Sequence, residues 1–236
     1  MSKGWTGPRL MWLVAIMAGL LVTMGQAQTA LLTSGVFLLD ESVSSLTASG
    51  TVGGNPVEPH GPGSLITSYS GTIAADFDLD AGTILFRPGA AAAANSGNWQ
   101  PRRGGASGSE PANYGGQGQV PFVGLGRLAV RDLVFSVLTD QRIPLTPAGE
   151  GVYAFESTQT LTINAGSADY NFNVASGSVN LTGRTAQNTA APGTLQDFGD
   201  GSFALTVPIE FTFMDSVGSI QAVLNMSGSI AGIAMP

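Results

Sequence analysis

The sequence predicts an all-β protein, built as an antiparallel β-sandwich or an up-and-down barrel, on three observations. Apolar and polar residues alternate along many segments, which indicates strands because successive strand side chains point to opposite faces of a sheet. A tripeptide of Gly, then Ser or Thr, then Val or Ile occurs six times; its glycine allows a turn or bulge, and the β-branched residue starts the next strand. After the N-terminal region, no segment carries apolar residues at the i, i+3, i+4, i+7 spacing of an amphipathic helix.

The N-terminal segment has the three parts of a secretory signal. Lys3 and Arg9 give it a positive start, residues 10–24 form an almost unbroken apolar run, and Gly25-Gln26-Ala27 offers small residues for cleavage after Ala27. The apolar run is about 15 residues long, which is short for a bilayer span of roughly 20. These features predict export.

We therefore expect a signal peptide over residues 1–27 and a single all-β domain over residues 28–236. The alternative is that the N-terminal segment is retained as an anchor. In either case the domain would be secreted, periplasmic or held at the cell surface.

The strands are expected where alternation is clearest. The expected ranges are 45–53, 65–79, 82–87, 126–138, 151–164, 168–175, 177–183, 202–214 and 217–231. The strongest of them places Phe211 on an apolar face and Thr212 on a polar one. Pro208 in the same strand predicts an edge, a bulge or a bend, because proline has no N–H to donate to a ladder.

The segment 88–120 interrupts the pattern and is expected to form one long Gly-rich loop. It carries Trp99, Arg102, Arg103 and Tyr114. Long loops in compact domains are usually functional or disordered, and disorder predicts few aromatic residues, so we expect Trp99 and Tyr114 to be packed. One interpretation is a structural lid whose aromatic rings plug an end of the barrel. The other is a ligand-contacting loop in which Trp99 stacks on a ligand and Arg102 or Arg103 binds an acidic or hydroxylated group.

Short stretches spread over most of the chain share a further likeness. They are Ser70–Ile73, Ser96–Pro101, Pro111–Gly115, Arg131–Leu133, Ala168–Asn171 and Ile209–Phe213. Together they resemble a group of exported bacterial proteins of unknown function, many of which end in a PEP-CTERM sorting tail made of a Pro-Glu-Pro motif, an apolar helix and a basic cluster. The chain differs from that group at Ala234-Met235-Pro236, where it has none of these features. The resemblance implies export and transfers no catalytic residue.

Three aspartates form the one candidate metal site. Asp76, Asp78 and Asp80 alternate with apolar residues, as the first carboxylates of a Ca²⁺ loop do. Position 6 of such a loop is Ala81 rather than Gly, and position 12 is Arg87 rather than Glu. The same alternation fits the acidic outer face of a strand, so a Ca²⁺ ion is the weaker of the two interpretations and no other cofactor is expected.

Composition argues against several classes of function. The chain has no cysteine and a single histidine, His60, which rules out disulfides and thiolate chemistry and argues against a Ser-His-Asp triad or a multi-histidine metal cluster. After residue 27 there is no lysine, and 16 acidic residues against 7 arginines leave a net charge of −9. That charge argues against nucleic acid or an anionic membrane surface as a partner. Because no carboxylates lie in a recognisable catalytic motif, we expect no enzyme.

Two functions of different class follow. The first is a non-catalytic exported protein with a structural, adhesive or assembly role, whose partners are cell-envelope or extracellular-matrix components. The second is a barrel that binds a small apolar or saccharide ligand under the 88–120 segment. The interior distinguishes them: a filled core favours the first, and an open cavity ending at Trp99 favours the second.

Overall fold

The computed structural model describes residues 32–61, 64–102, 107–121, 126–172, 175–217 and 220–236. The expected signal segment, residues 1–27, lies outside these ranges. Within them the chain contains no α-helix, and every strand pairing is antiparallel, which confirms the predicted all-β class. No helix in this part of the chain is long and apolar enough to span a membrane.

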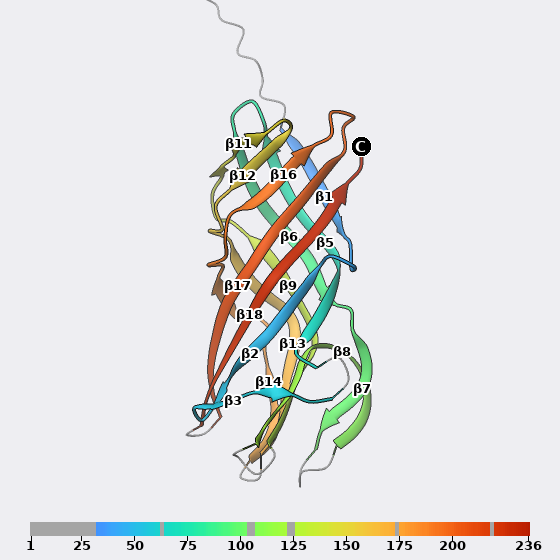
Figure 1. Cartoon of the computed structure of the whole chain (residues 1–236), viewed down its shortest axis with the longest axis vertical. Coiled ribbons are helices and arrows are strands. Elements are labelled where there is room, and N and C mark those ends of the chain that lie inside the picture. Colours follow the sequence, from blue (N-terminus) through green and yellow to red (C-terminus); the bar gives the residue numbers. More distant parts are fainter. Residues whose placement is uncertain (1–31, 62–63, 103–106, 122–125, 173–174, 218–219) are drawn as a thin grey trace, which may run out of the picture. The chain divides into compact units, whose positions relative to one another are not determined.

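The described residues form eighteen strands, most of which are labelled in Figure 1. They are β1 (Thr33–Leu39), β2 (Ser45–Val52), β3 (Asn55–Pro56), β4 (Glu58–Pro59), β5 (Ile66–Asp78), β6 (Thr83–Ala93), β7 (Ser96–Pro101), β8 (Ser107–Val120), β9 (Gly126–Leu138), β10 (Ile143–Pro144), β11 (Thr146–Gly149), β12 (Val152–Phe155), β13 (Thr160–Phe172), β14 (Ala175–Asn180), β15 (Thr185–Gln187), β16 (Gly193–Asp197), β17 (Phe203–Val217) and β18 (Ile220–Ala234).

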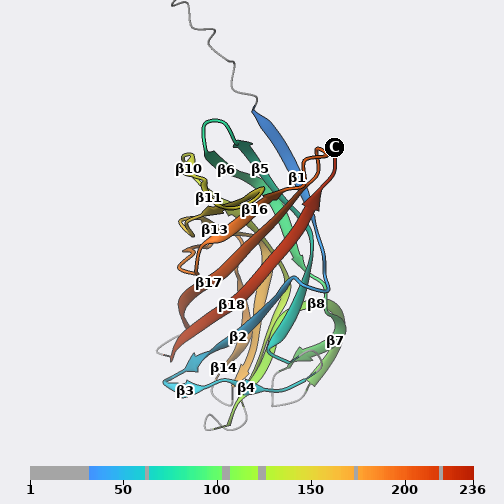
Figure 2. The same cartoon turned by 45° about the horizontal axis from the view of Figure 1, so that its top comes forward.

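The strands follow one another around a common interior, in a barrel-like arrangement (Figures 1 and 2). β17 and β18 form a hairpin paired along its full length. The C-terminal end of β18 pairs with β1, and the first half of β18 pairs with β2. Both β1 and β2 also pair with β5. From β5 the pairing continues through β6 and β9 to β13, which is bordered by β14 and β15. The first strands of the domain therefore lie beside the last one.

Inward-facing aromatic and aliphatic side chains fill most of the interior. Phe77 and Phe86 are almost completely buried. Their rings pack edge-on against Phe203 at 4.7 Å and Phe155 at 5.3 Å, between ring centroids. Burying one side chain of this size contributes roughly 1.5–3 kcal/mol. Alternation along β17 holds as predicted, since Phe211 is buried and Thr212 is exposed.

Pro208 lies on an open edge of β17, one of the alternatives that the sequence predicts. β16 pairs with β17 only as far as Thr206. Beyond that point the Asn188 side chain takes the place of a strand: its Nδ2 donates to Pro208 O at 2.9 Å, and Glu210 N donates to its Oδ1 at 2.9 Å. Because the N and C=O of one strand residue point the same way, the nitrogen of Pro208 also faces this edge, where no ladder bond is lost.

The expected loop over 88–120 is wrong: in the described part of this segment the chain forms strands. β6 runs on through the alanines to Ala93 and stays paired with β5, and β8 pairs with both β7 and β9. Small residues are required here. A side chain at Gly71 would collide with Ala90 O, and one at Gly97 would collide with the Tyr114 ring. Segments rich in Gly and Ala therefore form strands where neighbouring backbones or rings approach closely.

Boundaries near β13 also differ from expectation. The predicted strand 151–164 is divided, because residues 156–159 leave the sheet and separate β12 from β13; within them Thr158 N donates to Glu156 O at 3.0 Å. β13 then continues through the expected break at 165–167. Its pairing with β9 shifts register twice in this region. On the β9 side of the shifts lies Asp132, whose φ is positive at 50°. The expected ranges leave out nine strands of the described chain: β1, β3, β4, β7, β8, β10, β11, β15 and β16.

Candidate functional site

The β7–β8 hairpin lies over the outer face of β9. Trp99 and Tyr114 are 9% and 1% exposed, and they pack with Ala112 and Ala129 in a cluster separate from the interior core. Ala129 alternates with Val130, which belongs to the interior cluster, so Ala129 faces outward. The prediction that both rings are packed is confirmed. The rings cover the outside of the sheet, however, and do not plug an end of the barrel.

A buried ion pair joins the hairpin to the sheet. Arg131 Nε lies 3.3 Å from Asp169 Oδ2, and both side chains are less than a tenth exposed. The guanidinium of Arg131 also donates to Trp99 O at 2.7 Å and to Glu110 O at 3.1 Å. Asp169 accepts further hydrogen bonds from Ser178 Oγ at 2.6 Å and Gln100 Nε2 at 3.3 Å. A buried charge pair is tolerated when its polar atoms are satisfied in this way.

The other predicted residues of the hairpin lie apart from the two rings. Arg102 pairs across the hairpin with Glu110, Nη2 to Oε1 at 3.5 Å, and both side chains are more than half exposed. Arg103 lies outside the described residues. His60 contacts Trp99 with ring centroids 5.7 Å apart, and burial, followed by the charge of Arg127, lowers the pKa of His60. The structure therefore brings Trp99 and Tyr114 together with His60 and Arg131.

The three aspartates of the candidate Ca²⁺ site have different partners. Asp76 accepts from Ser34 Oγ at 2.8 Å and forms an ion pair with Arg87 at 2.6 Å. The Ser34 hydrogen bond, and then Arg87, outweigh burial and hold the pKa of Asp76 below its usual value. Asp78 caps a turn by accepting from Ala81 N at 2.8 Å, and Asp80 is exposed. Among the described residues, no group of three or more acidic or histidine side chains is placed to hold a metal ion.

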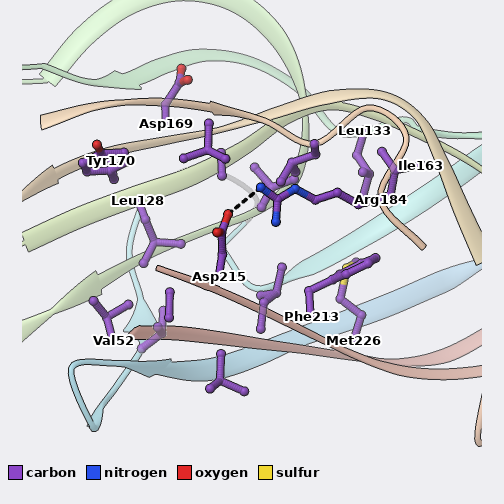
Figure 3. Close-up of a pocket in the computed structure, with 18 of the residues that line it drawn as sticks. Val52, Leu128, Leu133, Ile163, Asp169, Tyr170, Arg184, Phe213, Asp215 and Met226 are labelled. Atoms are coloured by element: carbon purple, nitrogen blue, oxygen red, sulfur yellow. Dashed lines mark ion pairs between the residues drawn. The ribbon is translucent and has the colours of Figure 1, made fainter. Parts of the chain in front are cut away.

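A cavity of about 120 Å³ lies between β13–β14 and β17–β18 (Figure 3). Most of its lining is aliphatic or aromatic. The lining residues that matter below are Leu133, Ile163, Ala168, Phe213, Ala222 and Met226. Of these, Leu133, Ile163 and Met226 are buried, and we refer to these three as the floor of the cavity. Trp99 does not line this cavity, so its position differs from the one that the sequence suggested.

Charged side chains face one another beside this apolar lining. Arg184 Nη2 and Asp215 Oδ2 are 2.8 Å apart, and each side chain is 33% exposed. Figure 3 shows the two side chains pointing toward each other. The third charged lining residue is Asp169, whose carboxylate is already bound to Arg131. The cavity therefore combines an apolar floor with a charge-neutral ion pair that reaches solvent.

Sequence reasoning missed both the cavity and the two ion pairs that flank it. Asp215 follows Phe211 and Phe213 at an inward position of an alternating strand, and this charge was a signal in the sequence; Arg131 lies at an outward position of β9 and gave none. No protein-family profile, curated protein or solved structure matches the chain.

Proposed function

We propose that this protein is a non-catalytic exported protein that binds a small apolar group in the cavity between β13–β14 and β17–β18. The observation that carries the proposal is the apolar lining of that cavity. Atoms that line a void lack dispersion partners on one side, and an apolar ligand supplies them. The volume of about 120 Å³ is close to that of an engineered apolar cavity of about 150 Å³ that stays dry and binds benzene or xenon.

Export is part of the same proposal. It is supported by the positively charged start, the apolar run over residues 10–24 and the small residues that follow at 25–27. A protein that holds a poorly soluble group in the periplasm or at the cell surface needs a shielded apolar site and a polar exterior. The outward residues of β2, such as Thr47 and Ser49, are exposed and polar.

A structural or adhesive role in the cell envelope is the second candidate, and an exposed aliphatic patch supports it. Val36 and Leu38 on β1 are 60% and 66% exposed, and Ile233 on β18, paired with Leu38, is 44% exposed. Exposed apolar patches often mark interaction sites. If the patch contacts envelope components, Leu38→Ser should reduce the amount of protein retained in the envelope fraction, while Thr47→Ser should not. Equal retention of the two variants would reject this role.

Benzene binding tests the cavity directly. Met226 lines the cavity, whereas Met214 and Met235 are 66% and 75% exposed and serve as internal references. Titration of benzene into the purified protein, labelled with ¹³C at methionine methyls, should shift the Met226 resonance saturably and leave the references unchanged.

A matched pair of variants controls for general effects. Ala168→Leu adds three carbon atoms inside the cavity and should abolish the benzene-induced shift. Ala204→Leu adds the same atoms on β17, beside buried Leu205 and therefore on the opposite face, and should preserve the shift. If benzene leaves Met226 unaffected in the parent protein, or shifts it equally in both variants, the proposed function is wrong.

A further inference from the structure

We propose that the ligand is a neutral amphiphile: a short aliphatic chain that fills the cavity, ending in a hydroxyl or amide group held between Arg184 and Asp215. This inference rests on the proposed function and adds the chemical class of the ligand. It depends on where the ion pair lies, how this side of the sheet is closed, and which charges the lining already contains.

The ion pair joins two walls of the cavity. Asp215 pairs in register with Ala222 on β18, which pairs in turn with Val52 on β2, and all three line the cavity. Arg184 follows the turn after β14, where its backbone O accepts from Ile163 N at 2.9 Å. The 2.8 Å contact between Arg184 and Asp215 therefore crosses from β17 to the β13–β15 side.

Along the outer edge of β17 after Glu210, side chains and not a ladder of backbone hydrogen bonds close the described structure. The last backbone hydrogen bond on the outer edge of β17 runs from Thr189 N to Glu210 O at 2.9 Å. From Phe211 to Ser216, the described strand pairs with β18 alone. An ion pair whose members are each one-third exposed can separate at a smaller cost than a strand ladder. A ligand that enters here meets the ion pair first and the buried floor last.

That order fixes the orientation of an amphiphile. The buried floor at Leu133, Ile163 and Met226 offers no hydrogen-bond donor and only the weak acceptor of the Met226 sulfur, so the hydrocarbon end must lie there. The polar end then lies beside Arg184 and Asp215, where it can exchange hydrogen bonds with water and with both side chains.

The neutral ion pair selects a neutral head. A ligand carboxylate would compete with Asp215 for Arg184 and place two like charges together, and an ammonium group would do the same beside Arg184. A hydroxyl or a primary amide can donate to the Asp215 carboxylate and accept from an Arg184 N–H at once, so both charges keep their partners. The acidic balance of the chain after residue 27 further disfavours an anionic ligand.

The size of the cavity limits the tail. Each added CH₂ group that enters the cavity should tighten binding about fourfold, until the space is full and further carbons extend into water. The expected ligands are therefore short-chain alcohols or amides, or longer amphiphiles of which only the terminal carbons are buried.

The test compares ligands that differ only in the head group. The Met226 methyl shift is titrated with 1-hexanol, hexanoate and hexylammonium, and benzene is run in parallel as a ligand without a head. The expected result is that 1-hexanol binds at least about tenfold more tightly than either charged analogue, and that affinity rises from 1-butanol to a plateau at longer alcohols.

Charge-changing variants test the part played by the ion pair. Asp215→Asn leaves Arg184 unpaired and should make hexanoate the preferred ligand, whereas Arg184→Gln leaves Asp215 unpaired and should favour hexylammonium. Asp140→Asn changes an exposed aspartate outside the cavity lining and should preserve the preference for 1-hexanol. Unchanged benzene binding in all three variants shows that the cavity is intact.

The outcomes separate this inference from the proposed function. If benzene binds but hexanoate or hexylammonium binds the parent protein as tightly as 1-hexanol, the preference for a neutral head group is wrong, while the cavity remains a binding site. An unchanged preference in Asp215→Asn and Arg184→Gln would also overturn the role of the ion pair. If neither benzene nor 1-hexanol shifts Met226, both the function and the inference fail.

Discussion

Phe211 lies near the middle of β17 with 2% of its side chain exposed, and its ring packs edge-on against Phe213 at 4.9 Å between centroids. Phe211→Ala should leave a cavity and lower the free energy of unfolding by roughly 3–5 kcal/mol. Thr212 is exposed and donates one hydrogen bond to Asn225 Oδ1, so Thr212→Ala should cost under about 1 kcal/mol. Urea denaturation measures both; equal losses would contradict the assignment of faces.

The two arginine–carboxylate pairs of the hairpin region differ in burial, and their energies should differ accordingly. Arg131→Met leaves the carboxylate of Asp169 buried without its partner and should cost roughly 3–5 kcal/mol in the free energy of unfolding. Arg102→Met removes an exposed pair with Glu110 and should cost under about 1 kcal/mol. The same denaturation experiment compares them, and a small loss for Arg131→Met would mean that the buried network contributes little.

Asp76 should make stability depend on pH in the acidic range. Its folded-state pKa lies below the usual value, chiefly through the Ser34 hydrogen bond. Its contribution to the free energy of unfolding is therefore present above the unfolded pKa of about 3.9 and is lost as pH falls through the folded pKa.

Between about pH 5 and pH 2, the free energy of unfolding should fall less in Asp76→Asn and Ser34→Ala than in the parent protein. Ser49→Ala, an exposed serine on β2, should keep the parent slope. Identical slopes for all four proteins would exclude this role.

At the scale of the element, the β7–β8 hairpin shows where sequence patterns stop being informative. Strands such as β2, β5, β9, β17 and β18 could be predicted because β-branched and aromatic residues alternate with polar ones. Residues 90–93 and much of β8 are Ala and Gly, which carry no such pattern and resemble loop composition. They become strands because β5, β7 and β9 supply the partner backbones. The sequence of one segment does not show which other segments will pair with it.

The same limit applies to the candidate site. Packing of Trp99 and Tyr114 could be predicted from the cost of leaving large rings in water. The Arg131–Asp169 and Arg184–Asp215 pairs join residues that are distant in the sequence, and the cavity depends on which inward side chains of several strands fail to fill the space between them. These features follow from the pairing of strands, so composition and spacing alone could not show them.

Trp99 reports on the packing of the hairpin. After removal of residues 1–27 it is the single tryptophan, since the other two are Trp5 and Trp12. A side chain that is 9% exposed should emit at blue-shifted wavelengths and be poorly quenched by iodide, because the indole is shielded from water and ions. Trp99→Phe supplies the background. Red-shifted and freely quenched emission would show that the hairpin does not stay packed on β9.

Benzene and 1-hexanol should leave this emission unchanged, because Trp99 does not line the cavity between β13–β14 and β17–β18. Emission that changes on addition of a saccharide would instead support the ligand-contacting interpretation of the hairpin. The same measurement thus separates a site at the hairpin from a site in the interior.

At the scale of the whole molecule, export predicts a defined start of the mature chain. Cleavage after Ala27 should give a protein that begins at Gln28 or within a few residues of it. Intact-mass measurement of protein from the periplasmic or extracellular fraction tests this directly. A full-length mass found in the membrane fraction would show that the N-terminal segment is retained as an anchor.

The place of β18 in the sheet governs when the molecule can finish folding. Among the described strands β18 comes last in the sequence, yet it is the neighbour of β1 at Leu38 and Leu39 and of β2 along Ser45–Val52. β1 and β2 therefore cannot complete their pairing until β18 has been synthesised, so the sheet stays open along that line until then. A chain that lacks β18 would leave β1, β2 and β17 with unpaired edges prone to aggregation.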